Sequence, residues 1–412
     1  MTAMRRRRVA VVGAGVVGVS TAYVLARDGY EVTLIDRRPT PGGGASAANA
    51  AQLSWAYGDA MASPALLRQL PSILCGRDPA FRFEWRIEPA FLLWGLRFLL
   101  NTPYGRWWDN TAHILELAEI SRREMDVLQK EVDLSFAYRA AGKLHLYADN
   151  AGFDSARRTV GKKRSLGIGQ DMISREEAIR IEPGLKQFRG EIAGAIHTPG
   201  DAVGDASAFC GALTDHMVRQ HGVTVIHGHT VAGFGVPRQG SLKTVRFQDR
   251  EDLETDFAVA ACGPETSSLI GSIPEARAIN PVRGYSLTIS VPEGAPSVSL
   301  TDVKRKLAFA RIGNAFRVAG LADIVAPASG FDTNRIGMLR DVARSVFPDF
   351  FAGPAGAVWS GERPMTPSSR PIIAPSRHIK GLYLNIGHGM LGWTLSLGSA
   401  RRLANMISTS AV

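Results

Sequence analysis

Three glycines and an aspartate near the start of the chain have the types and spacing of a nucleotide-binding site. Gly13, Gly15 and Gly18 form a GxGxxG pattern that Asp36 follows. The first glycine of such a pattern permits a tight turn, the second lets a pyrophosphate approach the backbone, and the third lets helix pack on strand. A carboxylate about 20 residues later binds ribose hydroxyls. The pattern predicts a site for the ADP half of a dinucleotide, with further contacts from Val16, Val17 and Arg37.

The elements that must position these residues form a βαβ unit. Residues 9–12 and 32–35 are β-branched apolar runs, as expected of buried parallel strands. The intervening segment predicts a helix that runs to about Asp28 and ends at Gly29. The amides at its N-terminus provide an anion site. Arginines at 5–8 imitate the basic start of a signal peptide, but glycines interrupt the apolar run, so we expect this segment to remain in the mature fold.

Composition limits the class of protein without naming a partner. A length of 412 residues predicts two domains, and 45% hydrophobic with 21% charged residues is typical of globular chains. The net charge of +10 suits nucleic acid, an anionic membrane or an anionic substrate, and does not choose among them. Cys75, Cys210 and Cys262 show no CxxC pair, so we expect no metal site and a reducing, cytoplasmic location.

One segment combines tryptophan with arginine. Residues 91–100 are apolar but fall well short of the roughly 20 needed to span a bilayer. The wider segment 85–108 has the composition of amphipathic helices that lie on anionic membranes. A helix packed on its own domain explains the same residues, and both interpretations stay open.

The sequence after Asp36 argues against a nicotinamide enzyme. Such an enzyme continues with regular βα repeats. Here a proline and glycine loop at 39–44 is followed by small residues at 45–51 and then by Gln52. Small side chains allow a backbone to lie against a flat cofactor.

Several longer stretches resemble a known family. Five stretches resemble the bacterial D-amino-acid dehydrogenases and occur in the same order along the chain. They are "VVGAGVVGVSTAYVLARDGYEVTLIDR", "SAANAAQLS", "PVRGYSLTI", "SGERPMTPSSRPII" and "LYLNIGHGMLGWTLSLGSA". The bacterial D-amino-acid dehydrogenases belong to the D-amino-acid oxidase and glycine oxidase superfamily of FAD enzymes. The resemblance implies FAD as the cofactor and a fold of class α/β. It also implies a Rossmann-like FAD-binding domain from residues 1–62, 152–275 and 345–412, and a smaller α+β substrate domain with a mixed or antiparallel sheet from 63–151 and 276–344.

Local patterns agree with that architecture. Residues 285–291 and 308–319 alternate as strands do, and 382–386 predicts a strand that leads through a glycine turn into a helix from 391 to about 407. The N-terminus of that helix would stabilise negative charge on a reduced flavin ring. By resemblance, the residues expected at the cofactor are Ala47, Ala48, Asn49, Gln52, Val231, Cys262, Gly263, Gly387, His388, Gly389, Met390, Leu391 and Gly392.

Arg363 is the predicted anchor of a substrate carboxylate. It lies in a G-x-R-P segment that resembles the one carrying this arginine in the superfamily, and a guanidinium can bind a carboxylate through two parallel hydrogen bonds. Tyr285 is a second candidate, although a buried core tyrosine is an alternative. We expect His388 to contact flavin or backbone and not to act as a base. Further cavity residues are expected at Arg305, where the family carries a tyrosine, and at Met365, Thr366 and Trp393.

These residues lead to one hypothesis and three alternatives. The first is FAD-dependent oxidation of a D-amino acid, or of an imino acid such as D-hydroxyproline, with electrons passed to a quinone or another carrier. Peripheral membrane association would suit that carrier, and no nucleic-acid partner is expected. The alternatives are a glycine or sarcosine oxidase that uses oxygen, a flavoprotein subunit inactive without its partner, and a nicotinamide dehydrogenase.

Overall fold

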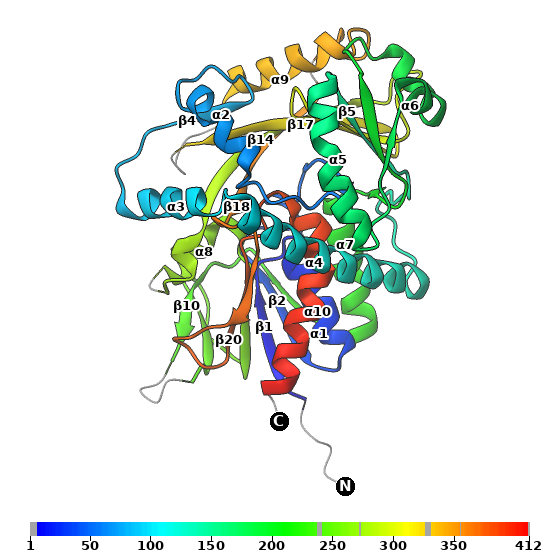
Figure 1. Cartoon of the computed structure of the whole chain (residues 1–412). Coiled ribbons are helices and arrows are strands. Elements are labelled where there is room, and N and C mark those ends of the chain that lie inside the picture. The colour runs from blue at the N-terminus through cyan, green and yellow to red at the C-terminus, as the bar shows by residue number, and fades with distance from the viewer. Residues whose placement is uncertain (1–5, 237–240, 272, 326–330, 355, 411–412) are drawn as a thin grey trace.

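The protein contains two large sheets, between which the chain passes several times (Figure 1). The computed structural model describes residues 6–236, 241–271, 273–325, 331–354 and 356–410. Figure 1 shows one sheet in the lower half of the molecule, near both termini, and the other in the upper half.

The lower sheet is the predicted nucleotide-binding sheet. Its six strands have the order β19-β20-β13-β1-β2-β9 and run parallel except for β19. The strands expected at 9–12, 32–35 and 382–386 are all confirmed. The bounds are β1 Arg8–Val12, β2 Glu31–Asp36, β9 Thr224–His227, β13 Phe257–Ala260, β19 Ile372–Pro375 and β20 Leu382–Ile386.

Each face of this sheet has its own apolar core, because successive side chains of a strand point to opposite faces. Val9 and Val11 pack in a core with residues of three helices and of the long helix α4 (Tyr104–Glu131), and Ala10 and Val12 pack in another with a small antiparallel sheet. The helices are α1 Val16–Arg27, α7 Ala206–His221 and α10 Gly392–Ser410, and the small sheet comprises β10 Val231–Gly235, β11 Thr244–Phe247 and β12 Leu253–Glu254. Shorter helices nearby are η2 Gly263–Glu265, α8 Thr266–Ile270, η3 Ala276–Ala278 and η4 Gly389–Leu391.

The upper sheet has nine strands and is mixed, as expected. Eight follow the order β18-β14-β17-β16-β15-β5-β7-β6, and β4 pairs with β17. The pairs β15/β5 and β17/β4 are parallel and the others antiparallel. The bounds are β4 Phe81–Phe83, β5 Lys143–Tyr147, β6 Asp171–Ile173, β7 Gly194–Thr198, β14 Asn280–Ser290, β15 Ser299–Asp302, β16 Leu307–Ile312, β17 Ala315–Ile324 and β18 Ala357–Met365.

The remaining helices cover the upper sheet or connect the two halves. They are α2 Pro64–Leu74, α3 Pro89–Leu100, α4 Tyr104–Glu131, α5 Asn150–Ser165, α6 Arg175–Ile181, η1 Pro183–Gln187 and α9 Thr333–Val346. A short ladder of β3 Gln52–Leu53 with β8 Ala202–Val203 joins distant parts of the chain. Among the described residues, no helix is both long and apolar enough to cross a membrane.

The strand pairing differs from the domain boundaries expected from the sequence. β6 and β7 fall within 152–275, and β18 within 345–412, yet all three strands belong to the upper sheet. Conversely, α4 falls within 63–151 but packs along α10 beside the lower sheet. The reason is physical: β7 pairs with β5 and β18 with β14 across long sequence separations, and local periodicity carries no record of such partners.

Candidate active site

A cavity of about 1030 Å³ is lined by residues of both sheets and of the loops between them. One end is formed by the GxGxxG loop and Asp36, and the other includes Arg363, Tyr285 and the turn at 387–392. The sequence therefore predicted residues at both ends of one continuous space, although they lie more than two hundred positions apart in the chain.

The glycine loop is shaped as its three positions require. Gly13 has a φ of +109°, and a Cβ there would lie 2.5 Å from the carbonyl oxygen of Ala261. A Cβ on Gly18 would lie 1.7 Å from the oxygen of Gly13, so helix and loop can touch only without a side chain. Gly15 lines the cavity, and a Cβ added there would have Ser46 Oγ as its nearest neighbour, at 3.7 Å. The backbone at Gly15 is thus open to an approaching phosphate.

Asp36 holds this loop and still faces the cavity. Its carboxylate accepts hydrogen bonds from the amides of Ala14 at 2.6 Å and Arg38 at 2.8 Å. Arg37 lies outside the cavity lining and forms an ion pair with Glu265 at 2.5 Å, whereas Arg38 lines the cavity and pairs with the same carboxylate. The cation beside the nucleotide end is Arg38, which the sequence analysis missed by one position.

The small-residue segment after Asp36 is fixed from the upper sheet. Ser286 Oγ donates to the oxygen of Ala48 at 2.7 Å, and Arg317 donates to the oxygen of Asn49 at 3.0 Å. Gln52 donates to the oxygen of Leu300 at 3.0 Å. Ala48, Asn49 and Gln52 line the cavity as expected, whereas Ala47 does not.

The C-terminal turn closes the other side of the cavity. All six residues from Gly387 to Gly392 line it, and α10 begins at the last of them. Gly387 and Gly389 have φ angles of +78° and +55°, and side chains there would collide with Thr366 and Met365. Met365 and Thr366 therefore support this turn from outside the cavity lining. Cys262 and Gly263 line the cavity, and Cys262 Sγ donates to the oxygen of Val12 at 3.2 Å.

His388 is a neutral imidazole at this site. It is 4% exposed, its Nε2 has no hydrogen-bond partner, and burial lowers its pKa to about 3. A ring that takes a proton only in strong acid is a weak base at neutral pH. That His388 contacts flavin or backbone stays a prediction.

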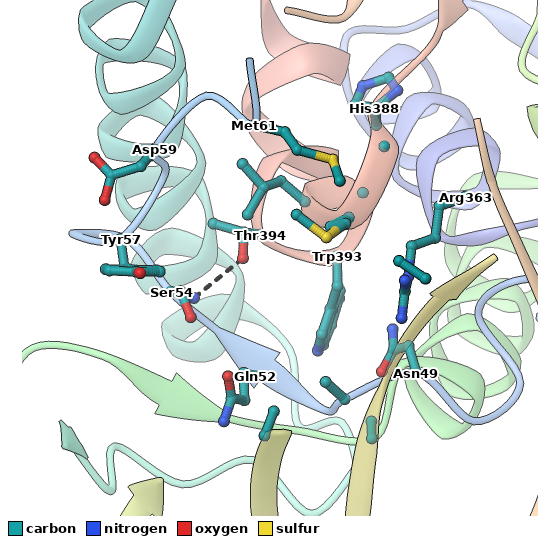
Figure 2. A pocket seen from close by; sticks show the side chains of 18 of the residues that line it. Asn49, Gln52, Ser54, Tyr57, Asp59, Met61, Arg363, His388, Trp393 and Thr394 are labelled. Atoms are coloured by element: carbon teal, nitrogen blue, oxygen red, sulfur yellow. Dashed lines mark hydrogen bonds between the residues drawn. The ribbon is translucent and has the colours of Figure 1, made fainter. Parts of the chain in front are cut away.

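Arg363 extends from β18 into the cavity (Figure 2). Among the described residues its guanidinium makes one hydrogen bond, from Nη1 to the oxygen of Leu321 at 2.9 Å, and no ion pair. Burial lowers its pKa to about 10. Gly284 on the neighbouring strand makes room for it, because a Cβ there would lie 2.0 Å from Nη2. A partly desolvated cation with vacant donors is suited to a carboxylate.

Tyr285 lines the same end of the cavity, but its hydroxyl hydrogen is already used. The hydroxyl donates to Asp323 Oδ2 at 2.8 Å, and burial raises its pKa to about 12. Asp323 is fully buried and also pairs with Arg335 at 2.6 Å and Arg82 at 3.1 Å. The Tyr285 oxygen can therefore accept a hydrogen bond from a ligand, whereas it has no hydrogen left to donate.

Two other predicted residues lie away from the cavity lining. Arg305 forms an ion pair with Asp302 at 2.8 Å, and the adjacent Lys306 is the residue of this turn that lines the cavity. Val231 lies on β10 in the small sheet and does not line it. Trp393 does line it and donates through Nε1 to the oxygen of Gly204 at 3.1 Å. Within the described part of the chain, no cluster of three metal-ligating side chains could hold an ion.

The structure adds a polar wall that the sequence analysis did not identify. Lys143 donates to Ser54 Oγ at 2.7 Å, and Lys163 pairs with Asp59 at 2.9 Å. Both ammonium groups lie about 5 Å from the ring centroid of Tyr57, at 5.1 and 5.0 Å. In the view of Figure 2, Tyr57 and Asp59 lie on the side of the cavity opposite Arg363. Alternating polar residues along β5, Lys143, His145 and Tyr147, were the available signal.

The residues present fit an extended dinucleotide. The Gly15 backbone and Asp36 suit a pyrophosphate and a ribose, and the turn at the other end of the cavity includes His388, whose Nε2 has no hydrogen-bond partner among the described residues. The cavity volume of about 1030 Å³ reaches the upper end of the usual range for ligand pockets. It accommodates a large cofactor together with a small molecule beside Arg363.

Comparisons with known proteins agree with this geometry. The profile of a family described as "DAO: FAD dependent oxidoreductase" matches residues 8–406. The chain is 39% identical over 417 residues to D-amino acid dehydrogenase 2 of Ralstonia nicotianae, covering 98% of this chain and 97% of that protein. It is 37% identical over 406 residues to D-amino acid dehydrogenase of Dechloromonas aromatica, covering 97% of each. Glycine oxidase from Bacillus cereus shares the fold, with a TM-score of 0.74 at 17% identity over 98% of this chain and 96% of that one.

Proposed function

This chain belongs to the DAO family of FAD dependent oxidoreductases, and we propose that it oxidises a D-amino acid, or a related imino acid such as D-hydroxyproline. FAD is accordingly its cofactor. The family, the cofactor and the fold class expected from the sequence are confirmed. The product of a primary amine would be an imine, which water converts to a 2-oxo acid and ammonia.

The observation that carries the proposal is the environment of Arg363. Its guanidinium lies in the cavity, partly desolvated and without an ion pair among the described residues, and the charge of Asp323 offsets only part of the effect of burial on its pKa. Holding such a charge is costly unless a ligand pairs with it. We assign this place to the substrate carboxylate, because every amino acid carries one.

The other residues at this end have roles that follow from their hydrogen bonds. When bound, FAD accepts the hydride from the substrate Cα. Tyr285 accepts a hydrogen bond from the substrate nitrogen, because its own hydrogen is held by Asp323. His388 stays uncharged, so it adds no positive charge to repel a protonated amine on arrival. No protein base is assigned, since a neutral amine needs none for hydride loss from Cα.

The electron acceptor is proposed to be a quinone or another carrier in place of oxygen. Both relatives are named dehydrogenases, which supports this choice. We place the enzyme on the cytoplasmic side, peripherally at the membrane, which suits a carrier dissolved there. Its three cysteines are free thiols, as a reducing compartment favours.

Anaerobic flavin bleaching tests the reaction directly. Purified holoenzyme would be mixed with D-amino acids, their L-enantiomers, cyclic imino acids and N-methylglycine while the flavin absorbance is followed. Bleaching by D-amino or D-imino acids supports the proposal, and bleaching by glycine or N-methylglycine alone would replace it with the oxidase alternative. Aerobic release of peroxide in equal amount to substrate would contradict the carrier. A flavin that no amino acid bleaches would indicate a subunit that requires a partner.

A further inference from the structure

A second buried cation lines the cavity at a distance from Arg363. Lys143 lies on β5, is 4% exposed and forms part of the cavity wall. Among the described residues, its ammonium group donates one hydrogen bond, to Ser54 Oγ at 2.7 Å, and forms no ion pair. Its other hydrogens remain for a ligand. Like Arg363, Lys143 is a buried cation whose charge is costly unless a ligand neutralises it.

The nearby carboxylates offset this charge only in part. Burial lowers the pKa of Lys143 to about 8, although the charge of Asp201 acts in the opposite direction. Asp201 lies outside the cavity lining and accepts a hydrogen bond from the amide of Ala56 at 3.2 Å. Asp59 does line the cavity, but it pairs with Lys163 at 2.9 Å. Of the two lysines in this wall, Lys143 is therefore the one whose charge is available to a ligand.

A hydroxyl group on the next strand also lacks a partner. Thr301 of β15 lines the cavity, and its buried Oγ1 has no hydrogen-bond partner among the described residues. In the parallel pair of β15 and β5, Ser299 lies opposite Lys143. Residues two apart in a strand point to the same face, so Thr301 and Lys143 share one face of the sheet. An ammonium group and a hydroxyl group on neighbouring strands are suitable donors to a carboxylate.

The exposed rim of the cavity also favours an anion. Arg68 of α2 and Arg158 of α5 line the cavity, are exposed, and form no ion pair within the described ranges. Asp154, an exposed carboxylate that lines the same cavity, pairs with Arg157 at 3.1 Å. Exposed cations at the mouth of a cleft raise the local concentration of anionic ligands. The rim therefore attracts the kind of ligand that Lys143 can neutralise.

Small residues leave a passage between the two buried cations. Arg363 is on β18 and Lys143 on β5, and the order of the sheet separates these strands by five spacings of about 4.8 Å each. Between them, Ala319 of β17 and Ala308 of β16 line the cavity. Figure 2 shows Ser54, the partner of Lys143, on the side of the cavity opposite Arg363. A ligand that reaches both cations must therefore be elongated.

Resting on the proposed function, we propose that the substrate is a D-amino acid with a long side chain that ends in a carboxylate. Arg363 binds the α-carboxylate, and Lys143 with Thr301 binds the carboxylate of the side chain. A neutral or cationic side chain would leave the buried charge of Lys143 without a counter-ion. D-Glutamate and D-2-aminoadipate reach further than D-aspartate, so they fit the elongated passage better.

Dicarboxylates that cannot react test this subsite without turnover. Calorimetry of the holoenzyme would compare adipate and pimelate with hexanoate and heptanoate, the monocarboxylates of equal chain length. Each dicarboxylate should bind at least about tenfold more tightly than its monocarboxylate, because it pairs with a second desolvated cation. Lys143→Met should remove this difference. The matched control Lys162→Met should keep it, because Lys162 lies on α5 beside Lys163 but outside the cavity lining.

Anaerobic flavin bleaching then tests the substrate itself. D-Glutamate and D-2-aminoadipate should have Kd values at least about tenfold lower than D-glutamine and D-norleucine, whereas Lys143→Met should bind acidic and neutral substrates alike. Equal affinities for acids and neutral analogues in the wild type would overturn the inference. So would loss of FAD from Lys143→Met, because the lysine would then hold the cofactor. If no amino acid bleaches the flavin, the proposed function fails, whereas the dicarboxylate measurement still decides the subsite.

Discussion

Replacing Arg363 with methionine should weaken substrate binding without weakening the fold. The guanidinium has one backbone partner and no ion pair among the described residues, and the proposed function assigns its charge to the substrate carboxylate. Burial lowers its pKa from 12.5 to about 10, and at 1.36 kcal/mol per pKa unit the buried charge costs up to about 3 kcal/mol of stability near neutral pH. Methionine removes that cost and keeps most of the volume.

The affinity change follows from the lost ion pair. Truncating one partner of a desolvated pair costs roughly 2 to 4 kcal/mol, which is about 30- to 900-fold in Kd. Arg363→Lys should fall between wild type and Arg363→Met, because an ammonium keeps the charge and loses the planar fork. The assay is anaerobic flavin reduction at increasing D-amino acid concentration, paired with the melting temperature of each holoenzyme.

A substrate control isolates the carboxylate. The amide of the same D-amino acid lacks the negative charge, so wild type should bind it about as weakly as Arg363→Met binds the acid. In the variant, acid and amide should bind alike. Arg335→Met is the matched protein control: this arginine pairs with buried Asp323 at 2.6 Å, so its loss should lower the melting temperature. An unchanged Kd in Arg363→Met, or a melting temperature that falls as far as in Arg335→Met, would refute the assignment.

Three further substitutions test the surroundings of the site. Gly284→Ala should reproduce the affinity loss of Arg363→Met while the flavin stays bound, because its Cβ would occupy the guanidinium position; normal affinity would show that the arginine has another place to go. Tyr285→Phe should raise Kd by about 3- to 10-fold if one hydrogen bond to the substrate nitrogen is lost, and an unchanged Kd in stopped-flow reduction would reduce the tyrosine to packing. Lys143→Met should raise the melting temperature most near neutral pH. Burial lowers the pKa of Lys143 from 10.5 to about 8, so between these pH values the unfolded chain binds more protons than the folded chain. The destabilisation caused by the buried charge of Lys143 therefore decreases as the pH rises from about 8 to 10.5. An identical gain at about pH 7 and about pH 10 would contradict that account of Lys143.

Local sequence patterns were sufficient to predict those parts of the cavity that are built from residues close together in the chain. The turn after β1 needs glycine because the backbone of Ala261 and the helix crowd it, and this requirement is visible as GxGxxG. The strand, turn and helix from residue 382 onward could also be predicted from local patterns, since α10 follows β20 closely in the chain. In both places, the residue types that make the fold are those that shape the cavity.

The features of the cavity that local sequence patterns did not predict depend on residues that strand pairing brings together. Gly284 is opposite Gly361 in the β14/β18 ladder, so two small residues flank the strand position from which Arg363 enters the cavity. Neither glycine lies in a turn, and each alone would be read as a weak point in a strand. Lys143 likewise becomes part of the cavity wall only because β5 lies between β15 and β7, and Tyr57 packs over Lys143 and His145. Chemistry at this site therefore depends on register: a shift of β18 by one residue against β14 would turn Arg363 to the other face of the sheet and leave the cavity without its cation.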